Sequence, residues 1–94
     1  MKEKDPGEKT EPWFLYILRC RDGSLYTGVT NNLDRRLKMH SAGRASKYTR
    51  TRLPVELLYQ ETCQGRTHAL VRECAVKEFS KRKKEELIKV CRTA

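Results

Sequence analysis

Short apolar runs separated by turn residues recur along the chain, and their spacing predicts both strands and helices. Strands are indicated where aromatic and branched residues cluster, and helices where apolar residues recur every three or four positions. The predicted strands span 13–19, 25–30 and about 55–60, and the predicted helices span 33–41, about 67–79 and a Lys- and Glu-rich stretch ending near Cys91. The order β-β-α-β-α-α predicts an α/β (α+β) fold, a three-stranded antiparallel sheet flanked by three helices.

The turn between the first two strands decides which side chains share a face of the sheet. A two-residue turn at Asp22-Gly23 would place Tyr16 and Tyr26 on opposite faces. A three-residue loop with a left-handed Gly23 would instead pair Tyr16 with Gly28 and place both phenols on one face. The sequence permits either register. We expect the second, because a site shared by the two tyrosines requires it.

Positive charge is concentrated in the middle of the chain, most of it in a predicted polar loop at 41–53. The formal net charge of the 94 residues is +9, and the segment 35–52 contains no acid. Its basic residues are Arg35, Arg36, Lys38, Arg44, Lys47, Arg50 and Arg52. Such a local positive field favours a polyanion such as nucleic acid. A membrane surface is disfavoured, because no basic amphipathic helix with an apolar aromatic face is evident.

The remaining composition narrows the expected class of protein. No apolar run approaches the length of about 18 residues that suggests a transmembrane helix. The polar N-terminal segment does not resemble a secretory signal, so we expect a cytoplasmic location and a disordered tail over 1–11. The four cysteines form no C-x-x-C pair, so we expect small apolar side chains rather than a zinc or redox site.

Three polar residues lie beside the apolar stripes of the predicted helices. Arg36 and His40 are four positions apart and therefore adjacent, whereas Arg35 points roughly 100° away from Arg36. Glu73 falls at the margin of the apolar side expected for the later helix. That expected side consists of Leu70, Val71, Cys74, Ala75 and Phe79. Each polar residue also has an ordinary interpretation: a solvated arginine, a histidine at a helix C-terminus and a Glu73–Lys77 ion pair.

Taken together, these positions resemble the GIY-YIG nuclease family over about residues 12–88, with 89–94 as a C-terminal end. FLY at 14–16 and YTG at 26–28 stand in place of its two signatures. The segment TNNLDRRLKMH that follows resembles the family segment carrying a functional arginine. The chain is most similar to the small single-domain bacterial members, the UPF0213-like proteins. By this register Arg36, not Arg35, is the functional arginine. His40 stands where the family has His or Tyr, and Glu73 stands where it has a metal-binding glutamate.

The resemblance implies a metal-dependent endonuclease that hydrolyses phosphodiester bonds in DNA, such as structured or damaged DNA during repair or recombination. It implies Mg²⁺ or Mn²⁺ held by Glu73, with Tyr26 as general base assisted by Tyr16. Arg36 would neutralise the phosphate, and His40 would orient it or share the role of base. The expected nucleic-acid contacts are Arg35, Lys38, Arg44, Lys47, Tyr48, Arg50 and Arg52.

Two other functions are compatible with the same residues. One is a non-catalytic nucleic-acid-binding module on the same scaffold, and the other is a protein whose basic face docks on an acidic partner. Tyr48 has two interpretations of its own, as a residue that stacks on a base or as an aromatic that anchors the loop. We expect no small-molecule cofactor. We do expect a protein partner that supplies specificity.

Overall fold

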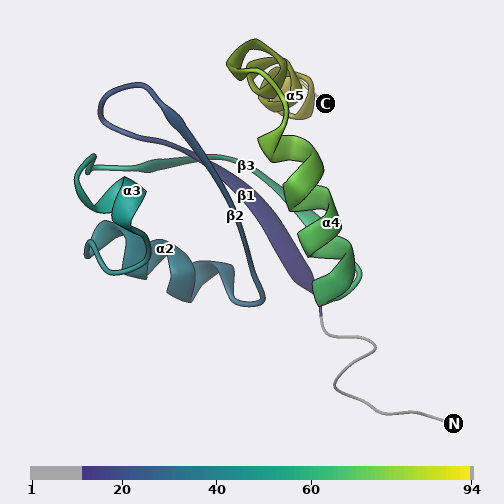
Figure 1. Ribbon diagram of the computed structural model, residues 1–94, viewed down its shortest axis with the longest axis horizontal. Helices are drawn as coiled ribbons and strands as arrows, with labels where there is room; N and C mark the ends of the chain where they lie inside the picture. Colours follow the sequence, from purple (N-terminus) through teal and green to yellow (C-terminus); the bar gives the residue numbers. More distant parts are fainter. Residues whose placement is uncertain (1–11, 94) are drawn as a thin grey trace, which may run out of the picture.

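A three-stranded antiparallel sheet lies at the centre of the computed structural model, which describes residues 12–93 (Figure 1). The strands are β1 (Trp13–Arg19), β2 (Leu25–Thr30) and β3 (Glu56–Cys63), and β1 lies between the other two. The predicted sheet and the predicted order of elements are confirmed, and β3 extends beyond its predicted end. The predicted disordered tail, residues 1–11, lies outside the described residues.

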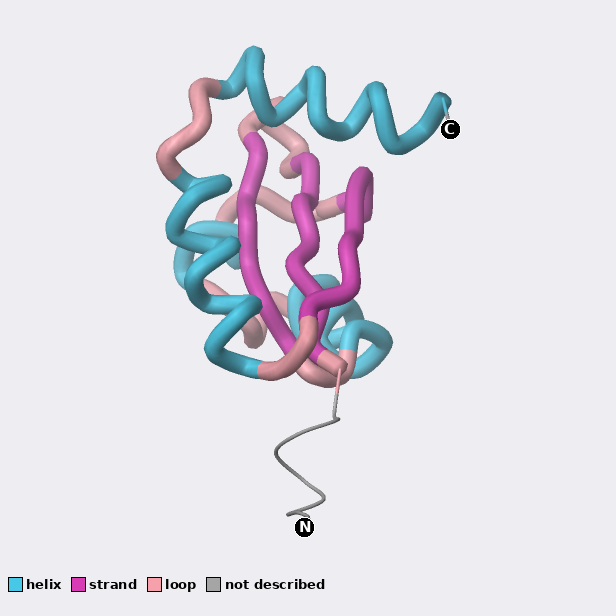
Figure 2. Tube along the Cα trace, turned by 90° about the vertical axis from the view of Figure 1, so that its right-hand side faces the viewer, coloured by secondary structure: helices cyan, strands magenta, loops and turns pink. Residues whose placement is uncertain are grey.

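Helices flank the sheet on both sides. They are α2 (Leu33–Ser41), α3 (Lys47–Arg50), α4 (Arg66–Lys77) and α5 (Lys81–Thr93). In Figure 1, α2 and α3 lie on one side of the strands and α4 lies on the other. Figure 2 shows α5 running across one end of the sheet. None of the helices between residues 12 and 93 has the length and apolar character needed to cross a membrane.

The helix α3 was not predicted, because its sequence was interpreted as part of a polar basic loop. Ser46 precedes this helix, and its hydroxyl oxygen accepts a hydrogen bond from the backbone N–H of Thr49 at 3.1 Å. This is an N-cap, which satisfies one of the free donors at the start of a helix. This single helical turn therefore depends on the Ser46 cap. The cap could not be recognised in the sequence, because no apolar periodicity follows it.

The hairpin between β1 and β2 has the register that places both tyrosines on one face. Tyr16 pairs with Gly28, and Leu18 pairs with Tyr26. The backbone N–H of Cys20 donates to the Ser24 carbonyl at 2.9 Å, which closes a three-residue loop. Gly23 in this loop has a φ of 86°, the left-handed conformation that glycine adopts without steric cost. The expected register is confirmed.

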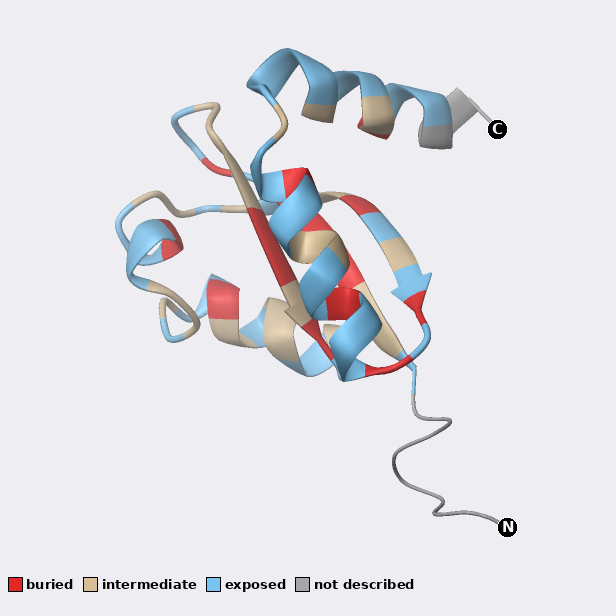
Figure 3. Ribbon diagram, turned by 45° about the vertical axis from the view of Figure 1, so that its right-hand side comes forward, coloured by how far each residue is buried: buried red, intermediate tan, exposed pale blue. Residues whose placement is uncertain are grey.

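The central strand is buried on both of its faces, because the consecutive residues Leu15, Tyr16, Ile17 and Leu18 are all at most 1% exposed. Figure 3 shows buried residues, in red, on the strands and on the helices that flank them. Leu15 and Ile17 point to one face and belong to the main hydrophobic core. Helices α4 and α5 supply Ala69, Val76 and Ile88 to the same core. Because side chains alternate along a strand, Tyr16 points to the opposite face, toward α2. One face of the sheet thus holds the core, and the other face holds Tyr16 and Tyr26.

The side of α4 that faces the sheet differs from the predicted one. Ala69 and Val76 are its buried residues, whereas Val71 is 65% exposed and Leu70 is 37% exposed. The predicted apolar side was therefore wrong for the residues within the helix, because Leu70, Val71, Cys74 and Ala75 are exposed. Phe79, just after the helix, does pack against the core as predicted. Glu73 lies on the half-buried side of the helix, between the two buried positions.

A polar cluster connects α4 to β3. Arg72 Nε donates to Glu61 Oε2 at 2.7 Å, and Arg72 Nη2 donates to Glu61 Oε1 at 3.2 Å. The Tyr59 hydroxyl donates to the same carboxylate. Burial by itself would raise the pKa of Glu61, but the hydrogen bonds from Arg72 and Tyr59 outweigh it and hold that pKa below its usual value. This pairing explains why the side of α4 that contains Arg72 faces the sheet, although other positions of the helix are more apolar.

Candidate active site

Three aromatic rings from two strands and a helix meet on the α2 side of the sheet. The ring centroids of Tyr16 and Tyr26 are 6.5 Å apart. The His40 ring lies 5.7 Å from Tyr16 and 5.3 Å from Tyr26, and it meets both at a steep angle. Residues separated by 24 positions in the sequence therefore form one cluster. This cluster contains three of the four residues that were expected to be catalytic.

The position of Tyr16 depends on a glycine on the neighbouring strand. A Cβ atom added to Gly28 would lie 2.6 Å from the Tyr16 hydroxyl oxygen and 2.7 Å from its Cζ. Real Cβ atoms do not approach other atoms so closely, so only glycine leaves room for the phenol. Tyr16 lies across this glycine and is only 1% exposed. The Tyr16 ring thus fills the space that a side chain at position 28 would occupy.

A chain of hydrogen bonds runs from Tyr16 toward the start of α3. The Tyr16 hydroxyl and His40 Nε2 are 2.9 Å apart, and His40 Nδ1 and Thr49 Oγ1 are also 2.9 Å apart. Ser46 Oγ lies 3.1 Å from Thr49 Oγ1. His40 and Thr49 are completely buried. Sequence reasoning missed Thr49 and Ser46, because hydroxyl residues in a basic segment carry no periodic signal.

Charged groups from α2 and α4 both act on the Tyr16 hydroxyl. Burial raises the pKa of Tyr16 above its ordinary value, and the Tyr26 phenol and the Glu73 carboxylate raise it further, while Arg36 opposes them. Burial also lowers the pKa of His40, and the Arg36 charge lowers it further. A neutral His40 and a protonated Tyr16 follow. The charges of Arg36 and Glu73 and the Tyr26 phenol thus all affect the pKa of Tyr16, and His40 lies within hydrogen-bond distance of the same hydroxyl.

Glu73 is the carboxylate that was expected to bind a metal ion. Its side chain is 19% exposed, and Lys77 Nζ lies 3.3 Å from Glu73 Oε2. The ordinary i, i+4 ion pair is therefore present, alongside the electrostatic effect of Glu73 on Tyr16. Within residues 12–93, no three His, Cys, Asp or Glu side chains gather closely enough to hold a metal ion. A cation here would depend on one carboxylate, which is common for Mg²⁺ because this ion keeps several waters.

Tyr48 and Arg52 stack in sequence on Tyr26, at the edge of the cluster. The Tyr48 ring stacks with Tyr26, with centroids 6.0 Å apart and planes at 23°. The Arg52 guanidinium carbon lies 3.9 Å from the centre of the Tyr48 ring. Arg52 also donates to Asp22 Oδ2 at 3.0 Å and to the Tyr48 carbonyl at 2.8 Å. These contacts connect α3 to the hairpin loop and favour the interpretation of Tyr48 as a loop-anchoring aromatic.

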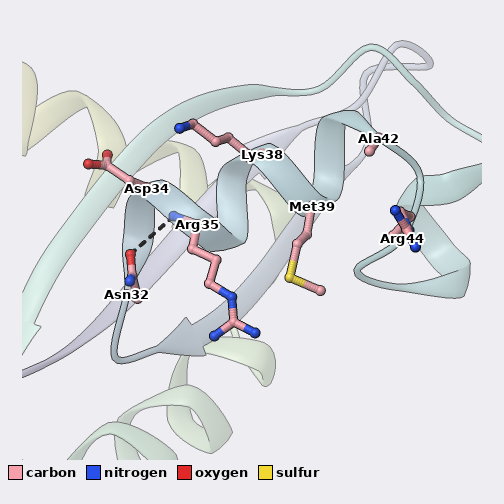
Figure 4. A pocket seen from close by; sticks show the side chains of 7 residues that line it. All are labelled: Asn32, Asp34, Arg35, Lys38, Met39, Ala42 and Arg44. Atoms are coloured by element: carbon pink, nitrogen blue, oxygen red, sulfur yellow. Dashed lines mark hydrogen bonds between the residues drawn. The ribbon is translucent and has the colours of Figure 1, made fainter.

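The other expected nucleic-acid contacts that line pockets lie on α2, on α3 and in the loop between them. Arg35, Lys38 and Arg44 border a pocket of about 820 Å³ on the outer side of α2 (Figure 4). Arg35 also borders a small pocket of about 30 Å³ that includes Arg36. Lys47 and Arg50 line a pocket of about 230 Å³ together with Arg44. The basic surface therefore extends from Arg36 along α2 to α3.

Comparison with known proteins identifies the domain. Residues 12–86 match the model of the GIY-YIG catalytic domain. The UPF0213 protein DP2720 of Desulfotalea psychrophila is 49% identical over 85 residues, which cover 89% of this chain and 77% of that protein. The UPF0213 protein SH2523 of Staphylococcus haemolyticus is 45% identical over 75 residues, which cover 80% of this chain and 92% of that protein.

Two solution NMR structures are similar to this one. The UPF0213 protein BH0048 of Bacillus halodurans is 43% identical, with a TM-score of 0.55 and coverage of 84% of each chain. The protein EF2693 of E. faecalis is 34% identical, with a TM-score of 0.62 and coverage of 93% of each chain. GIY-YIG domains are nuclease domains that generally use divalent metal ions. The chain belongs to the GIY-YIG catalytic domain family and to the UPF0213 proteins within it.

Proposed function

We propose that the protein is a metal-dependent DNA endonuclease that hydrolyses phosphodiester bonds in structured or damaged DNA. One observation carries this proposal. The Tyr16, Tyr26 and His40 rings meet on one face of the sheet, where Arg36 and Glu73 both act electrostatically on the Tyr16 hydroxyl. Binding alone needs positive charge, whereas hydrolysis needs a base, a cation for the developing charge and a ligand for a metal.

The two tyrosines have different proposed roles because their surroundings differ. Tyr16 is almost completely buried, and its raised pKa keeps its proton in place at neutral pH. Tyr26 is only partly buried, so its hydroxyl is the one that can reach an attacking water. The Tyr26 ring also lies beside Tyr16 and His40, with centroids 6.5 and 5.3 Å away, so it belongs to the same cluster. Tyr26 is therefore the proposed general base, and Tyr16 assists it.

Arg36 and His40 have complementary proposed roles. Arg36 is partly exposed at the inner end of the basic surface, where it can stabilise the negative charge of a phosphate. His40 is completely buried, and its two ring nitrogens lie within hydrogen-bond distance of Tyr16 and Thr49. His40 therefore acts on the reaction through Tyr16 and does not contact the phosphate itself.

Glu73 is the proposed ligand for Mg²⁺ or Mn²⁺. Its carboxylate is the one whose charge acts on Tyr16, and a single carboxylate with bound waters suits these ions. When bound, the cation supplies Lewis acidity at the phosphate oxygens. Arg35, Lys38 and Arg44 then hold the DNA backbone along α2, next to Arg36.

Nicking assays with matched glutamate variants test the proposal. The purified protein is incubated with single-stranded, duplex and branched DNA, with and without Mg²⁺, and binding is measured in parallel. We expect nicking that requires Mg²⁺, is lost in Glu73→Gln and is kept in Glu78→Gln, which removes an exposed carboxylate just after the same helix. Salt-sensitive binding without nicking of any substrate would instead indicate a non-catalytic binding module. Absence of DNA binding would indicate a protein partner.

A further inference from the structure

The buried hydrogen-bond chain behind Tyr16 has a direction that the proposed catalytic roles do not explain. Its members are Tyr16, His40, Thr49 and Ser46, in that order. Each hydroxyl has one proton, and the neutral imidazole has one ring proton. The protons can therefore all be donated outward, from Tyr16 to Ser46, or all inward, from Ser46 to Tyr16. The two arrangements place the His40 proton on different nitrogens.

The Thr49 hydroxyl couples the two ends of this chain. It is completely buried and lies 2.9 Å from His40 Nδ1 and 3.1 Å from Ser46 Oγ. Because it has one proton and two lone pairs, it can donate to at most one of these neighbours and must accept from at least one of them for both contacts to form. The partner of one ring nitrogen sets the tautomer of a histidine. Thr49 thus determines which nitrogen of His40 faces Tyr16 as an acceptor.

Burial selects the outward direction. In the inward arrangement the unused proton would belong to Tyr16, which is 1% exposed. In the outward arrangement it belongs to Ser46, which is only partly buried and can donate to water. A buried donor without an acceptor costs free energy, whereas a donor at the surface does not. The outward arrangement also pairs the phenol, the most acidic donor of the chain, with the imidazole nitrogen, its most basic acceptor.

We propose that Thr49 is a positioning residue that accepts the Nδ1 proton of His40 and so keeps Nε2 free to accept the Tyr16 proton. With its own proton directed at His40, the Tyr16 oxygen presents its lone pairs toward Tyr26 and the reaction site. His40 then shares the role of base indirectly, by holding the Tyr16 oxygen as an acceptor. The use of these lone pairs rests on the proposed nuclease function, whereas the position of the His40 proton does not.

Nitrogen-15 NMR of the histidine side chains tests this proposal in the intact protein. The chain has two histidines, and the second supplies an internal reference. The Gln64 N–H donates to His68 Nδ1 at 2.9 Å, so His68 carries its proton on Nε2. We expect His40 to show the opposite tautomer, with its proton on Nδ1, and a His68→Gln spectrum assigns the signals. A His40 proton on Nε2 in the unmodified protein would overturn the proposal, with no variant needed.

Two variants of Thr49 test its specific role. Thr49→Val keeps the shape but removes the hydroxyl, so we expect the His40 proton to move to Nε2. Thr49→Ser keeps the hydroxyl and should keep the proton on Nδ1. In nicking assays Thr49→Val should lower kcat about tenfold with little change in KM, as expected when a single hydrogen bond is removed, and Thr49→Ser should restore it. An unchanged tautomer in folded Thr49→Val would refute the role of Thr49. Absence of nicking by the unmodified protein would refute the nuclease function and leave the tautomer result intact.

Discussion

A single glycine fixes the position of the most buried phenol of the site. Tyr16 lies across Gly28 on the neighbouring strand, at a distance that no Cβ atom could tolerate. The phenol is thereby directed at His40, which holds its hydroxyl at 2.9 Å. At the scale of single residues, the position of Tyr16 therefore depends on the lack of a side chain at Gly28.

Replacing Gly28 with alanine should disturb both folding and activity. The added methyl group would meet the Tyr16 hydroxyl and Cζ at 2.6 and 2.7 Å, so the ring must move away from His40. Overpacking of this kind costs about 1–3 kcal/mol. We expect Gly28→Ala to lower the free energy of unfolding by that amount in urea titrations and to reduce nicking more than tenfold.

The exposed strand residue Thr62 offers a control for alanine in this sheet. Thr62→Ala should change the free energy of unfolding by much less, because nothing has to move to accommodate it. If Gly28→Ala proved as stable and as active as the unmodified protein, Tyr16 would not need its observed position. The proposed geometry of the site would then be incorrect.

At the scale of elements, much of the fold could be predicted from local sequence. The strands β1 and β2 and the helix α2 have their predicted bounds. The hairpin register was predictable only as one of two choices, because Asp22-Gly23 fits both loop lengths and the expectation of a shared site decided between them. The helix α3 was missed because a four-residue helix has no apolar period. Thr49, which this helix supplies to the site, was missed with it.

The orientation of α4 could not be predicted, because polar partners on the sheet determine it. The sequence suggests that Leu70 and Val71 should face inward, yet Arg72 and Glu73 occupy the inner side with Ala69 and Val76. Arg72 reaches the Glu61 carboxylate on β3, a residue that is eleven positions away. Apolar residues tolerate exposure more easily than a buried carboxylate tolerates the loss of its partner. Glu73 lies on this same half-buried side of the helix.

The Glu61–Arg72 pair should make stability depend on pH. The hydrogen bonds to Glu61 lower its pKa in the folded state relative to the ordinary value of 4.5. A lowered carboxyl pKa contributes stability that is present above the unfolded pKa and is lost as pH falls through the folded pKa. We expect the free energy of unfolding to fall below about pH 4.5, and this fall to be smaller in Glu61→Gln, as measured by urea titrations at several pH values.

Glu56→Gln provides the matched control on the same strand. Glu56 forms an exposed pair with Arg19, in which both side chains are more than half exposed. Exposed pairs contribute little to stability, so this variant should keep the acid-dependent loss of the unmodified protein. Equal pH profiles for Glu61→Gln and the unmodified protein would show that the Glu61 pair does not stabilise the attachment of α4.

At the scale of the whole molecule, the sheet separates two tasks. One face carries the hydrophobic core under α4 and α5, and the other carries the aromatic cluster beside α2 and α3. Helix α4 contributes to both, because it supplies Ala69 and Val76 to the core and Glu73, whose charge acts on Tyr16. The basic surface of Arg35, Lys38 and Arg44 lies on α2 and the loop that follows it, next to the pocket of Arg36. Substrate binding can therefore be altered on α2 with little effect on the core.

Removing charge from α2 should weaken DNA binding in a salt-dependent manner. The triple variant Arg35→Gln/Lys38→Gln/Arg44→Gln removes the cations that line the pocket of about 820 Å³. Each phosphate that a basic side chain neutralises adds about 0.9 to the slope of log K against log salt for duplex DNA. We expect the variant to show lower affinity in binding titrations at several salt concentrations. Its slope should be smaller by about 0.9 for each phosphate that is no longer neutralised.

A second triple variant separates local binding by α2 from the effect of net charge. Lys81→Gln/Arg82→Gln/Lys89→Gln removes the same charge from exposed positions on α5, which lies across the end of the sheet. It should reduce the slope much less. Equal slopes for the two variants would indicate that DNA responds only to the overall charge and that α2 is not its binding surface.

The central claim is that five side chains scattered along the chain converge on one site for a divalent cation. Titration with paramagnetic Mn²⁺, followed by the broadening of backbone amide NMR signals, tests it most directly and requires no turnover. We predict that the most strongly broadened signals belong to residues around Tyr16, Tyr26, Arg36 and Glu73, and that Glu73→Gln abolishes this pattern while Glu78→Gln preserves it. Broadening that centred on Asp34 or Glu86, or that persisted in Glu73→Gln, would contradict the account.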